Sequence, residues 1–210
     1  MAEGAIPGVL LAGGQARRMG GGDKGRLEVA GTSLIERAIT RLAPQAAPLA
    51  LNANGDAARF ADLGLPVIAD SVAGWPGPLA GVLAGLDWAA EQGAERIVTA
   101  AADTPFFPAD LVARLVAGAD AAGAPIALAA TPDPERGRVR HPTFGLWPVA
   151  LREDLRAALA EGVRKVVLWT DRHGAVDVTF EARPEADPFF NVNTPEDLAE
   201  AEARARGQAA

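Results

Sequence analysis

The sequence contains no cysteine, which excludes disulfide bonds, thiolate metal sites and cysteine nucleophiles. It also lacks an excess of positive charge: the formal net charge is -7, which argues against a general affinity for nucleic acid. The conspicuous uncharged stretch between Asp70 and Asp87 is too short and too interrupted by proline to span a bilayer, and the start MAEGAIPG has no basic residue before its apolar part. We therefore expect a cytoplasmic protein that binds neither nucleic acid nor membranes.

What the sequence does contain is typical of one globular α/β domain. Its 210 residues suffice for a single well-packed domain, and apolar residues make up 49% of them. Short apolar runs alternate with segments of helical periodicity, which predicts a mostly parallel sheet with helices on both faces. We expect one domain over residues 1–210.

The expected elements follow from periodicity and from capping signals. Ser33 and Glu36 form a capping-box pattern, and Thr194 with Pro195 marks the start of the last helix. Strands are predicted at 8–12, 48–52, 65–70, 96–103, 125–130, 141–147 and 174–180. Helices are predicted at 33–42, 79–92, 108–123, 149–161 and 194–207, with helix favoured at 163–174 and a charged turn at 131–140.

A glycine-rich and basic stretch, LLAGGQARRMGGGDKGRLEVAG (10–31), follows the first predicted strand. Glycine turns between a strand and a helix expose backbone N–H groups that bind phosphate oxygens. Several cations add charge to the stretch: Arg17, Arg18, Lys24 and Arg26. The pattern favours a triphosphate site beginning at Gly13 and Gly14; the alternative is a surface loop with solvated cations.

Asp103 follows an apolar strand and precedes Thr104 and Pro105. Parallel strands place ligands outside their carboxyl ends, so Asp103 and the glycine stretch are expected at one edge of the sheet. A lone carboxylate there suits Mg²⁺, which keeps several waters and takes one or two protein carboxylates. The alternative is a turn cap. Asp70 also ends a strand, and it either contacts the nucleotide or metal or begins a turn.

Three short motifs and one histidine also have both binding and structural interpretations. PGPLAG (76–81) either lets a ligand approach the backbone or only turns the chain. NAN (52–54) and NVN (191–193) supply amides for hydroxyls and base edges, or serve as turns. His141 has no second histidine at ligand spacing, so a packed or substrate-facing side chain is expected in place of a metal ligand.

Together these residues resemble the molybdenum cofactor guanylyltransferases (MobA-type). The motifs run in order over about residues 8–198: LAGGQARRMGGGDKG (11–25), NAN (52–54), GPLAG (77–81), DTPFFP (103–108), HPTF (141–144) and NVNTPEDL (191–198). Each motif alone is weak, but six in register are specific. The resemblance implies a Rossmann-like nucleotidyltransferase fold and transfer of GMP from Mg-GTP to the terminal phosphate of molybdenum-carrying molybdopterin, with release of pyrophosphate.

The resemblance also implies roles for individual residues. Arg18, Lys24 and Asp103 would be catalytic, with Asp103 binding Mg²⁺ and the cations neutralising the triphosphate. Asn191 and Asn193, with His141, would face the pterin substrate. Together with the glycine motifs, the resemblance predicts nucleotide contacts at Leu11, Ala12, Gly13, Gly14, Lys24, Asn52, Asp70, Gly77, Gly81 and Asp103. The nucleotide part would span about residues 8–105 and the pterin side about 106–206.

Two rival functions remain open at this point. One is a related nucleotidyltransferase that uses CTP or a sugar phosphate, although Gly13 stands where cytidylyl relatives usually have alanine. The other is a non-catalytic module that binds GTP or molybdopterin, which would not need Arg18, Lys24 and Asp103 together. Because the product is labile, we also expect contacts with acceptor molybdoenzymes or their chaperones.

Overall fold

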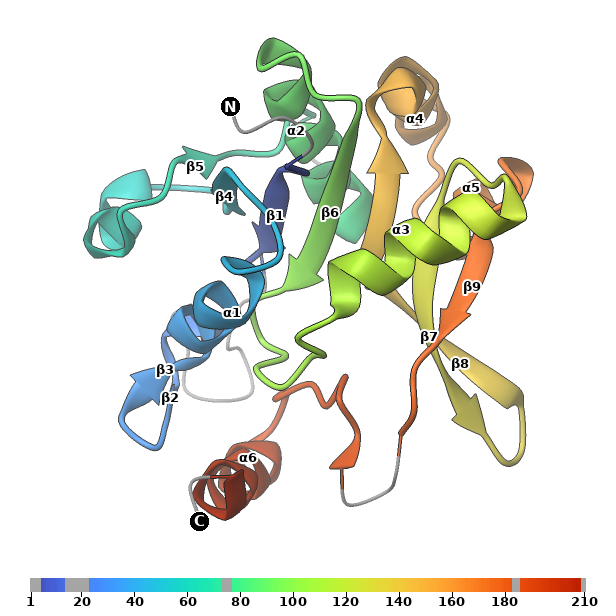
Figure 1. Ribbon diagram of the computed structural model, residues 1–210. Coiled ribbons are helices and arrows are strands. Elements are labelled where there is room, and N and C mark those ends of the chain that lie inside the picture. The colour runs from blue at the N-terminus through green and yellow to red at the C-terminus, as the bar shows by residue number, and fades with distance from the viewer. Residues whose placement is uncertain (1–4, 14–22, 73–76, 183–185, 209–210) are drawn as a thin grey trace.

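The fold is centred on one seven-stranded sheet in the order β5-β4-β1-β6-β8-β7-β9 (Figure 1). The computed structural model describes residues 5–13, 23–72, 77–182 and 186–208. The strands are β1 (Gly8–Leu11), β4 (Leu49–Asn52), β5 (Val67–Ile68), β6 (Arg96–Ala101), β7 (Ala127–Asp133), β8 (Gly137–Pro148) and β9 (Val176–Thr179). A separate antiparallel pair consists of β2 (Glu28–Val29) and β3 (Thr32–Ser33).

The sheet is mostly parallel, as predicted. β5, β4, β1 and β6 pair in parallel, and β7 pairs in parallel with β9. β8 runs antiparallel to both β6 and β7. Because β1 lies between β4 and β6, the carboxyl ends of these three strands meet at one edge of the sheet.

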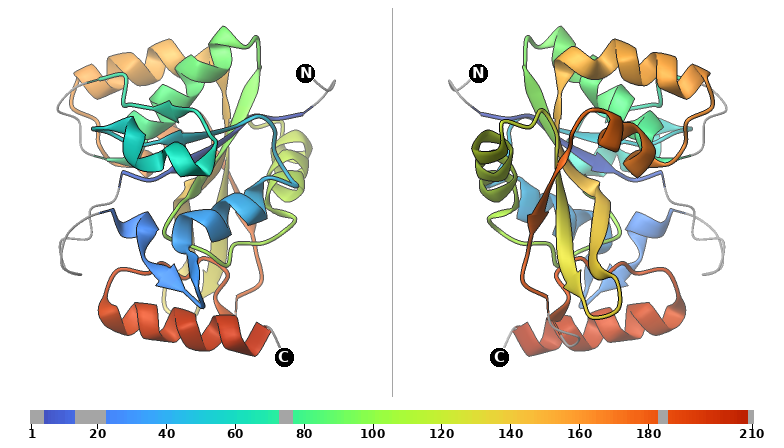
Figure 2. Two further views of the ribbon diagram at one scale, coloured as in Figure 1. Left: turned by 90° about the vertical axis from the view of Figure 1, so that its left-hand side faces the viewer. Right: turned by 90° about the vertical axis from the view of Figure 1, so that its right-hand side faces the viewer.

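Helices cover both faces of the sheet (Figure 2). Alternating side chains of each strand point to opposite faces, so Leu10 joins one apolar cluster and Val9 the other. The first cluster includes α1 (Leu34–Leu42) and α3 (Leu111–Ala122). The second includes α2 (Pro78–Glu91), α4 (Arg152–Ala160) and α5 (Val166–Arg172). This arrangement confirms the predicted α/β class with helices on both faces.

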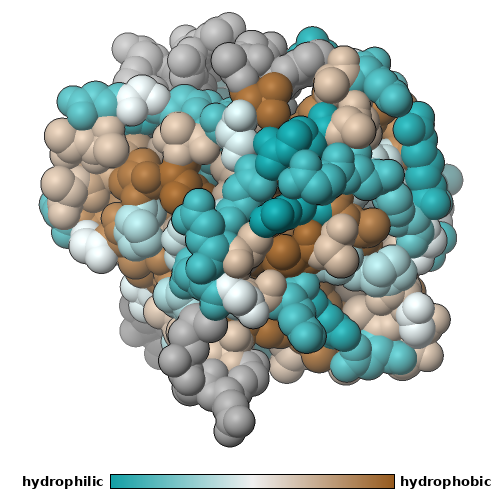
Figure 3. All heavy atoms as spheres, turned by 90° about the horizontal axis from the view of Figure 1, so that it is seen from above, coloured by the Kyte–Doolittle hydropathy of each residue, from teal (hydrophilic) through white to brown (hydrophobic). Residues whose placement is uncertain are grey.

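The last helix, α6 (Pro195–Gln208), lies below the end of the sheet toward which β1 and β6 run (Figure 1). It packs on β2 through a small apolar cluster that contains Val29 and Ala201. The short 3-10 segments are η2 (Lys24–Arg26), η3 (Ala57–Leu63) and η4 (Val149–Leu151). The opposite edge of the sheet, seen from above in Figure 3, shows apolar areas divided by hydrophilic side chains.

Local signals account for several helix boundaries. The Ser33 side chain accepts a hydrogen bond from the Glu36 N–H, and the Glu36 carboxylate accepts from the Ser33 N–H, which confirms the capping box of α1. Thr194 Oγ1 accepts from the Asp197 N–H at 3.2 Å at the start of α6. In α2, a Cβ on Gly85 would lie 2.9 Å from Val9 Cγ2, so glycine lets this helix pack closely on β1.

Three boundary predictions were wrong. The turn predicted at 131–140 is confined to 134–136, because β7 continues to Asp133 and β8 begins at Gly137, so the two strands form a hairpin. α3 begins at Leu111 and not at residue 108, because the residues before it form turns. The strand predicted at 65–70 is confined to Val67–Ile68, the two residues that pair with β4. The helix favoured at 163–174 is present as α5.

Candidate functional site

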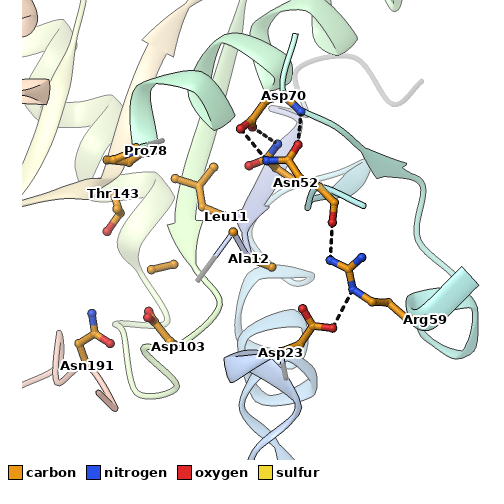
Figure 4. Close-up of a pocket in the computed structure, with 14 residues that line it drawn as sticks. Leu11, Ala12, Asp23, Asn52, Arg59, Asp70, Pro78, Asp103, Thr143 and Asn191 are labelled. Carbon is orange, nitrogen blue, oxygen red and sulfur yellow. Dashed lines mark hydrogen bonds and ion pairs between the residues drawn. The ribbon is translucent and has the colours of Figure 1, made fainter. Parts of the chain in front are cut away.

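A pocket of about 600 Å³ lies at the sheet edge where β1, β4 and β6 end (Figure 4). This volume is within the range of small-molecule and cofactor sites. The described residues that line it are Leu11, Ala12, Gly13, Asp23, Asn52, Asn54, Arg59, Asp70, Gly77, Pro78, Ala101, Asp103, Thr143 and Asn191. The sequence prediction that the ends of the first strand and of the strand before Asp103 lie together is confirmed by the pairing of Leu11 with Ala101.

One end of the pocket is an amide–carboxylate network, which we call the amide end (Asn52, Asn54 and Asp70). Asn52 Nδ2 donates to Asp70 Oδ1 at 3.0 Å, and Asn54 Nδ2 donates to Asp70 Oδ2 at 2.7 Å. The Asp70 N–H in turn donates to Asn54 Oδ1. Within the described residues, Asn52 Oδ1 accepts no hydrogen bond. Asn52 Oδ1 lies against Gly81 of α2, so the Asp70 carboxylate is the main acceptor group that the amide end brings to the pocket.

Gly77 and Gly81, at the start of α2, have different surroundings. Gly77 has φ +150° at the N-cap of α2 and lines the pocket. Gly81 does not line it. A Cβ on Gly81 would collide with Asn52 Oδ1 and lie 2.9 Å from Leu11 Cδ2, so the glycine makes room for the Asn52 side chain. Gly81, predicted as a nucleotide contact, therefore packs against the side chain of Asn52, another predicted contact.

A second wall of the pocket comes from η3. Arg59 Nε forms an ion pair with Asp23 Oδ2 at 2.7 Å, and Arg59 Nη2 donates to the Asn54 carbonyl oxygen at 2.6 Å. Arg26 holds Asp62 with two hydrogen bonds of 2.5 and 2.7 Å. The hydrogen bonds between them raise the pKa of Arg26 and lower that of Asp62. These contacts fasten the Asp23–Arg26 segment to η3.

The opposite end of the pocket is built around Lys24, and we call it the lysine end (Lys24, Asp103, Asn191 and Asn193). The ammonium group lies 2.6 Å from Asp103 Oδ2, 3.0 Å from Asn191 Oδ1 and 2.5 Å from Asn193 Oδ1. These three contacts use all three of its N–H donors. Lys24 is only 6% exposed and does not line the pocket, whereas Asp103 and Asn191 do.

The backbone reinforces the lysine end. The Val192 N–H donates to the Asp103 carbonyl oxygen at 3.0 Å, which joins the loop before α6 to the end of β6. The Asn193 N–H donates to Asp197 Oδ2 at 2.8 Å, so the same loop is also tied to the first turn of α6. Asn191 and Asn193, which the resemblance assigns to the pterin substrate, therefore contact the catalytic candidate Lys24, and their role toward the pterin stays a prediction.

Asp103 retains capacity for a cation. Its Oδ2 is paired with Lys24, but among the described residues its Oδ1 has only a 3.4 Å contact with Thr104 Oγ1, and the side chain is 20% exposed. An oxygen of this kind suits Mg²⁺ that keeps most of its waters or takes phosphate oxygens. The described residues contain no group of three or more histidine, aspartate or glutamate side chains placed to cage a metal. The donor set thus fits a metal that arrives with a nucleotide.

His141 is half-buried and does not line the pocket. One ring nitrogen lies 2.9 Å from Thr131 Oγ1, and the imidazole stacks on Phe189 with ring centroids 4.3 Å apart. Burial lowers the pKa of His141 below its ordinary value of 6.5, against a smaller opposing effect of the Asp187 charge. These contacts agree with a packed side chain, and the substrate-facing role stays a prediction.

Several site residues differ from the sequence prediction. The predicted Gly14 and Arg18 lie outside the described residues. Arg59, Ala101, Thr143 and Asp23 line the pocket without an individual prediction, whereas Asn54 and Pro78 belong to the predicted motifs NAN and PGPLAG. Thr143 belongs to the HPTF motif, so a signal for it existed; no local pattern marks Arg59.

Among the described helices, none is long and apolar enough to cross a membrane.

Comparisons with known proteins agree with this architecture. Residues 8–175 match the family described as MobA-like NTP transferase domain. The molybdenum cofactor guanylyltransferase of Bradyrhizobium sp. (strain ORS 278) is 58% identical over 94% of this chain and 92% of its own length. The guanylyltransferase of Rhodopseudomonas palustris (strain BisB5) is 57% identical over 94% of this chain and 93% of its own.

Solved structures show the same fold at lower identity. Molybdopterin-guanine dinucleotide biosynthesis protein A from Archaeoglobus fulgidus is 23% identical, with a TM-score of 0.73 over 96% of this chain and 100% of its own. The 2-C-methyl-D-erythritol 4-phosphate cytidylyltransferase from Thermus thermophilus is 22% identical, with a TM-score of 0.70 over 94% of this chain and 98% of its own. The family match and the two relatives above 50% identity decide the assignment: this chain belongs to the MobA-like NTP transferase family and is a nucleotidyltransferase.

Proposed function

We propose that this chain is a molybdenum cofactor guanylyltransferase that transfers GMP from GTP to molybdenum-carrying molybdopterin. An oxygen of the acceptor phosphate attacks the α-phosphorus of GTP, and the bond to the β-phosphate breaks, so that pyrophosphate leaves. The observation that carries the proposal is the 58% identity, over 94% of the chain, to a protein named for this activity. The pocket supports it, because its volume and its position at the strand ends suit a nucleotide.

The amide end is the part of the pocket that we assign to the guanine nucleoside. The Asp70 carboxylate, oriented by the Asn52 and Asn54 amides, offers acceptors there. The N1–H and N2–H groups of guanine are donors, whereas the corresponding edge of cytosine has one amino donor and two acceptors. The acceptor-rich amide end therefore favours GTP over CTP. Leu11, Ala12, Gly13 and Gly77 also line the pocket.

We assign the triphosphate to the middle of the pocket and the metal to Asp103. When bound, Mg²⁺ supplies positive charge on the phosphate oxygens and stabilises the departing pyrophosphate. Lys24 holds the Asp103 carboxylate by its Oδ2 and leaves Oδ1 for the metal. The Gly14 backbone and the Arg18 guanidinium, which lie outside the described residues, complete the proposed phosphate site. Catalysis of this kind rests on positioning and charge neutralisation and needs no protein nucleophile.

The proposal also covers the cell compartment of the reaction, the proteins that receive its product and the division of the chain into two parts. A GTP-consuming step belongs in the cytoplasm, and a labile cofactor product calls for direct transfer to acceptor molybdoenzymes or their chaperones. The division into a nucleotide part at about residues 8–105 and a pterin side at about 106–206 stays a prediction. Lys24 and Asp103 come from the first part and Asn191 and Asn193 from the second, so the lysine end lies where the two parts meet.

One reaction tests the function directly. Purified protein is mixed with Mg-GTP and molybdenum-loaded molybdopterin, and the products are analysed for the guanine dinucleotide and for pyrophosphate. Parallel reactions replace GTP by CTP, omit the metal, or substitute a sugar phosphate for the pterin. Dinucleotide formed only with GTP, metal and molybdopterin supports the proposal. Product from CTP or the sugar phosphate points to the related nucleotidyltransferases, and binding without pyrophosphate release points to a non-catalytic module.

A further inference from the structure

The pairing of β8 is interrupted at the pocket. Leu128 and Ala129 are consecutive on β7, but they pair with Gly145 and His141 on β8. Pro142, Thr143 and Phe144 therefore form a bulge without partners on β7. Bulges next to active sites re-aim a side chain, and proline suits such a position because it has no N–H to donate.

The bulge separates the two side chains that follow Pro142. Phe144 is buried and packs against Phe107 and Phe189, with ring centroids 5.5 and 4.8 Å apart. Thr143 lines the pocket on the side of Asp103 and Asn191, across from Asn52 (Figure 4). Within the described residues, Thr143 Oγ1 has no hydrogen-bond partner, so its hydroxyl is available to a ligand.

A buried network holds the backbone of this residue. Thr99 is fully buried on β6, and its hydroxyl donates to the Thr143 carbonyl oxygen at 2.9 Å. Trp147 Nε1 donates to the same Thr99 hydroxyl at 2.8 Å. The Trp147 Nε1–H and the Thr99 hydroxyl both have hydrogen-bond partners in this network, which makes the backbone position of Thr143 rigid. Side chains held in this way suit a preorganised binding site.

We propose that the Thr143 hydroxyl binds the terminal phosphate of the pterin substrate, a role that rests on the proposed guanylyltransferase function. The order of the strands supports the acceptor over the nucleotide. The amide end lies on β4 and beside β5, and Asp103 follows β6, so a nucleotide reaching from one to the other leaves the β8 side open. Thr143 and Asn191 line that side, and a hydroxyl donates well to a phosphate oxygen.

The test compares binding of the two substrates to matched variants. Thr143→Val removes the hydroxyl and keeps the branched shape, whereas Thr143→Ser restores the hydroxyl. Thr179→Val, an exposed threonine on β9, makes the same chemical change outside the pocket. Molybdenum-loaded molybdopterin is titrated through its pterin absorbance, and Mg-GTP is titrated separately by calorimetry. We expect Thr143→Val to bind molybdopterin about tenfold more weakly or worse, with GTP affinity unchanged, and we expect Thr143→Ser and Thr179→Val to behave as wild type.

The binding measurement separates this inference from the proposed function. Wild-type affinity for molybdopterin in Thr143→Val overturns the inference, as does equal weakening of GTP and molybdopterin or failure of Thr143→Ser to restore binding. Absence of molybdopterin binding to the wild-type protein also overturns it. If the wild type binds molybdopterin through Thr143 but forms no dinucleotide, the inference stands and the guanylyltransferase function fails.

Discussion

The two ends of the pocket are built in different ways. The amide end joins residues separated by 16 to 18 positions, on adjacent strands, and contains a carboxylate bonded by neutral amides. The lysine end joins residues separated by 79 to 169 positions and is centred on a buried cation. The amide end is thus a local structure with spare acceptors. The lysine end is a tertiary structure whose cation uses all three of its donors on described residues.

The largest effect should come from removing the charge of Asp103. Asp103→Asn keeps the shape and an oxygen for Lys24, but it weakens metal binding at the lysine end. We expect folding to persist and the rate of pyrophosphate release to fall by ~10²-fold or more, the scale of losing one electrostatic contact in an active site. The rate and the melting temperature are measured across a Mg²⁺ titration.

Asp120→Asn is the matched control, because Asp120 pairs with Arg96 on the surface away from the pocket. If Asp103→Asn keeps the wild-type rate and metal dependence, Asp103 is a turn residue and the metal lies elsewhere.

Replacing Lys24 should affect stability at the lysine end. Lys24→Met keeps the length of the side chain and leaves Asp103, Asn191 and Asn193 without their shared partner. We expect a loss of about 2 kcal/mol in the free energy of unfolding, less than for a fully buried pair because Asp103 remains partly solvated. Urea denaturation measures the loss. Lys165→Met, at an exposed lysine before α5, should change little, and an unchanged Lys24→Met would show that the contacts of Lys24 contribute nothing to folding.

A smaller change tests the amide end. Gly81→Ala places a methyl group against Asn52 Oδ1 and Leu11 Cδ2, so the Asn52 side chain must move. We expect GTP to bind about tenfold more weakly, the typical result of displacing one hydrogen-bonding group, while molybdopterin affinity is kept. Calorimetric titration measures both affinities. Gly207→Ala in α6 is the control, since a Cβ there meets no atom within 4 Å. Normal GTP binding by Gly81→Ala would show that the position of the Asn52 side chain does not affect nucleotide recognition.

The smallest effect concerns His141, which packs beside the pocket but outside both ends. Its pKa is lowered by burial, so between the folded pKa and 6.5 the unfolded chain binds more protons than the folded one. Stability should therefore fall as the pH drops through about 6.5 and level off below the folded pKa. We compare urea denaturation of the wild type and His141→Gln from about pH 7.5 to about pH 5.5. The wild type should lose more stability over this range. If both proteins lose stability equally as the pH falls, the lowered pKa of His141 is contradicted.

The one large error in the predicted fold shows what residue patterns miss. The stretch 131–140 has many charged residues and was predicted as a turn, yet most of it forms the β7–β8 hairpin. Its side chains are largely exposed, because this hairpin extends past the helices that cover the sheet. Backbone hydrogen bonds pair the strands there, and they need no apolar side chains. Hydrophobic periodicity detects burial, so it fails where strands are solvated on both faces.

The sequence by itself determined the α/β class, the strand that leads into the glycine stretch, and the placement of Asp103, Asn52 and Asp70 at strand ends. These features depend on short-range patterns, and parallel strands bring their carboxyl ends to one edge whatever the details of packing. Only the tertiary structure decided that Lys24 binds Asp103, Asn191 and Asn193, and that Arg59 and Thr143 line the pocket. Ion pairs across more than 70 positions and a register shift between strands depend on how distant segments pack, and no local pattern of residues specifies that.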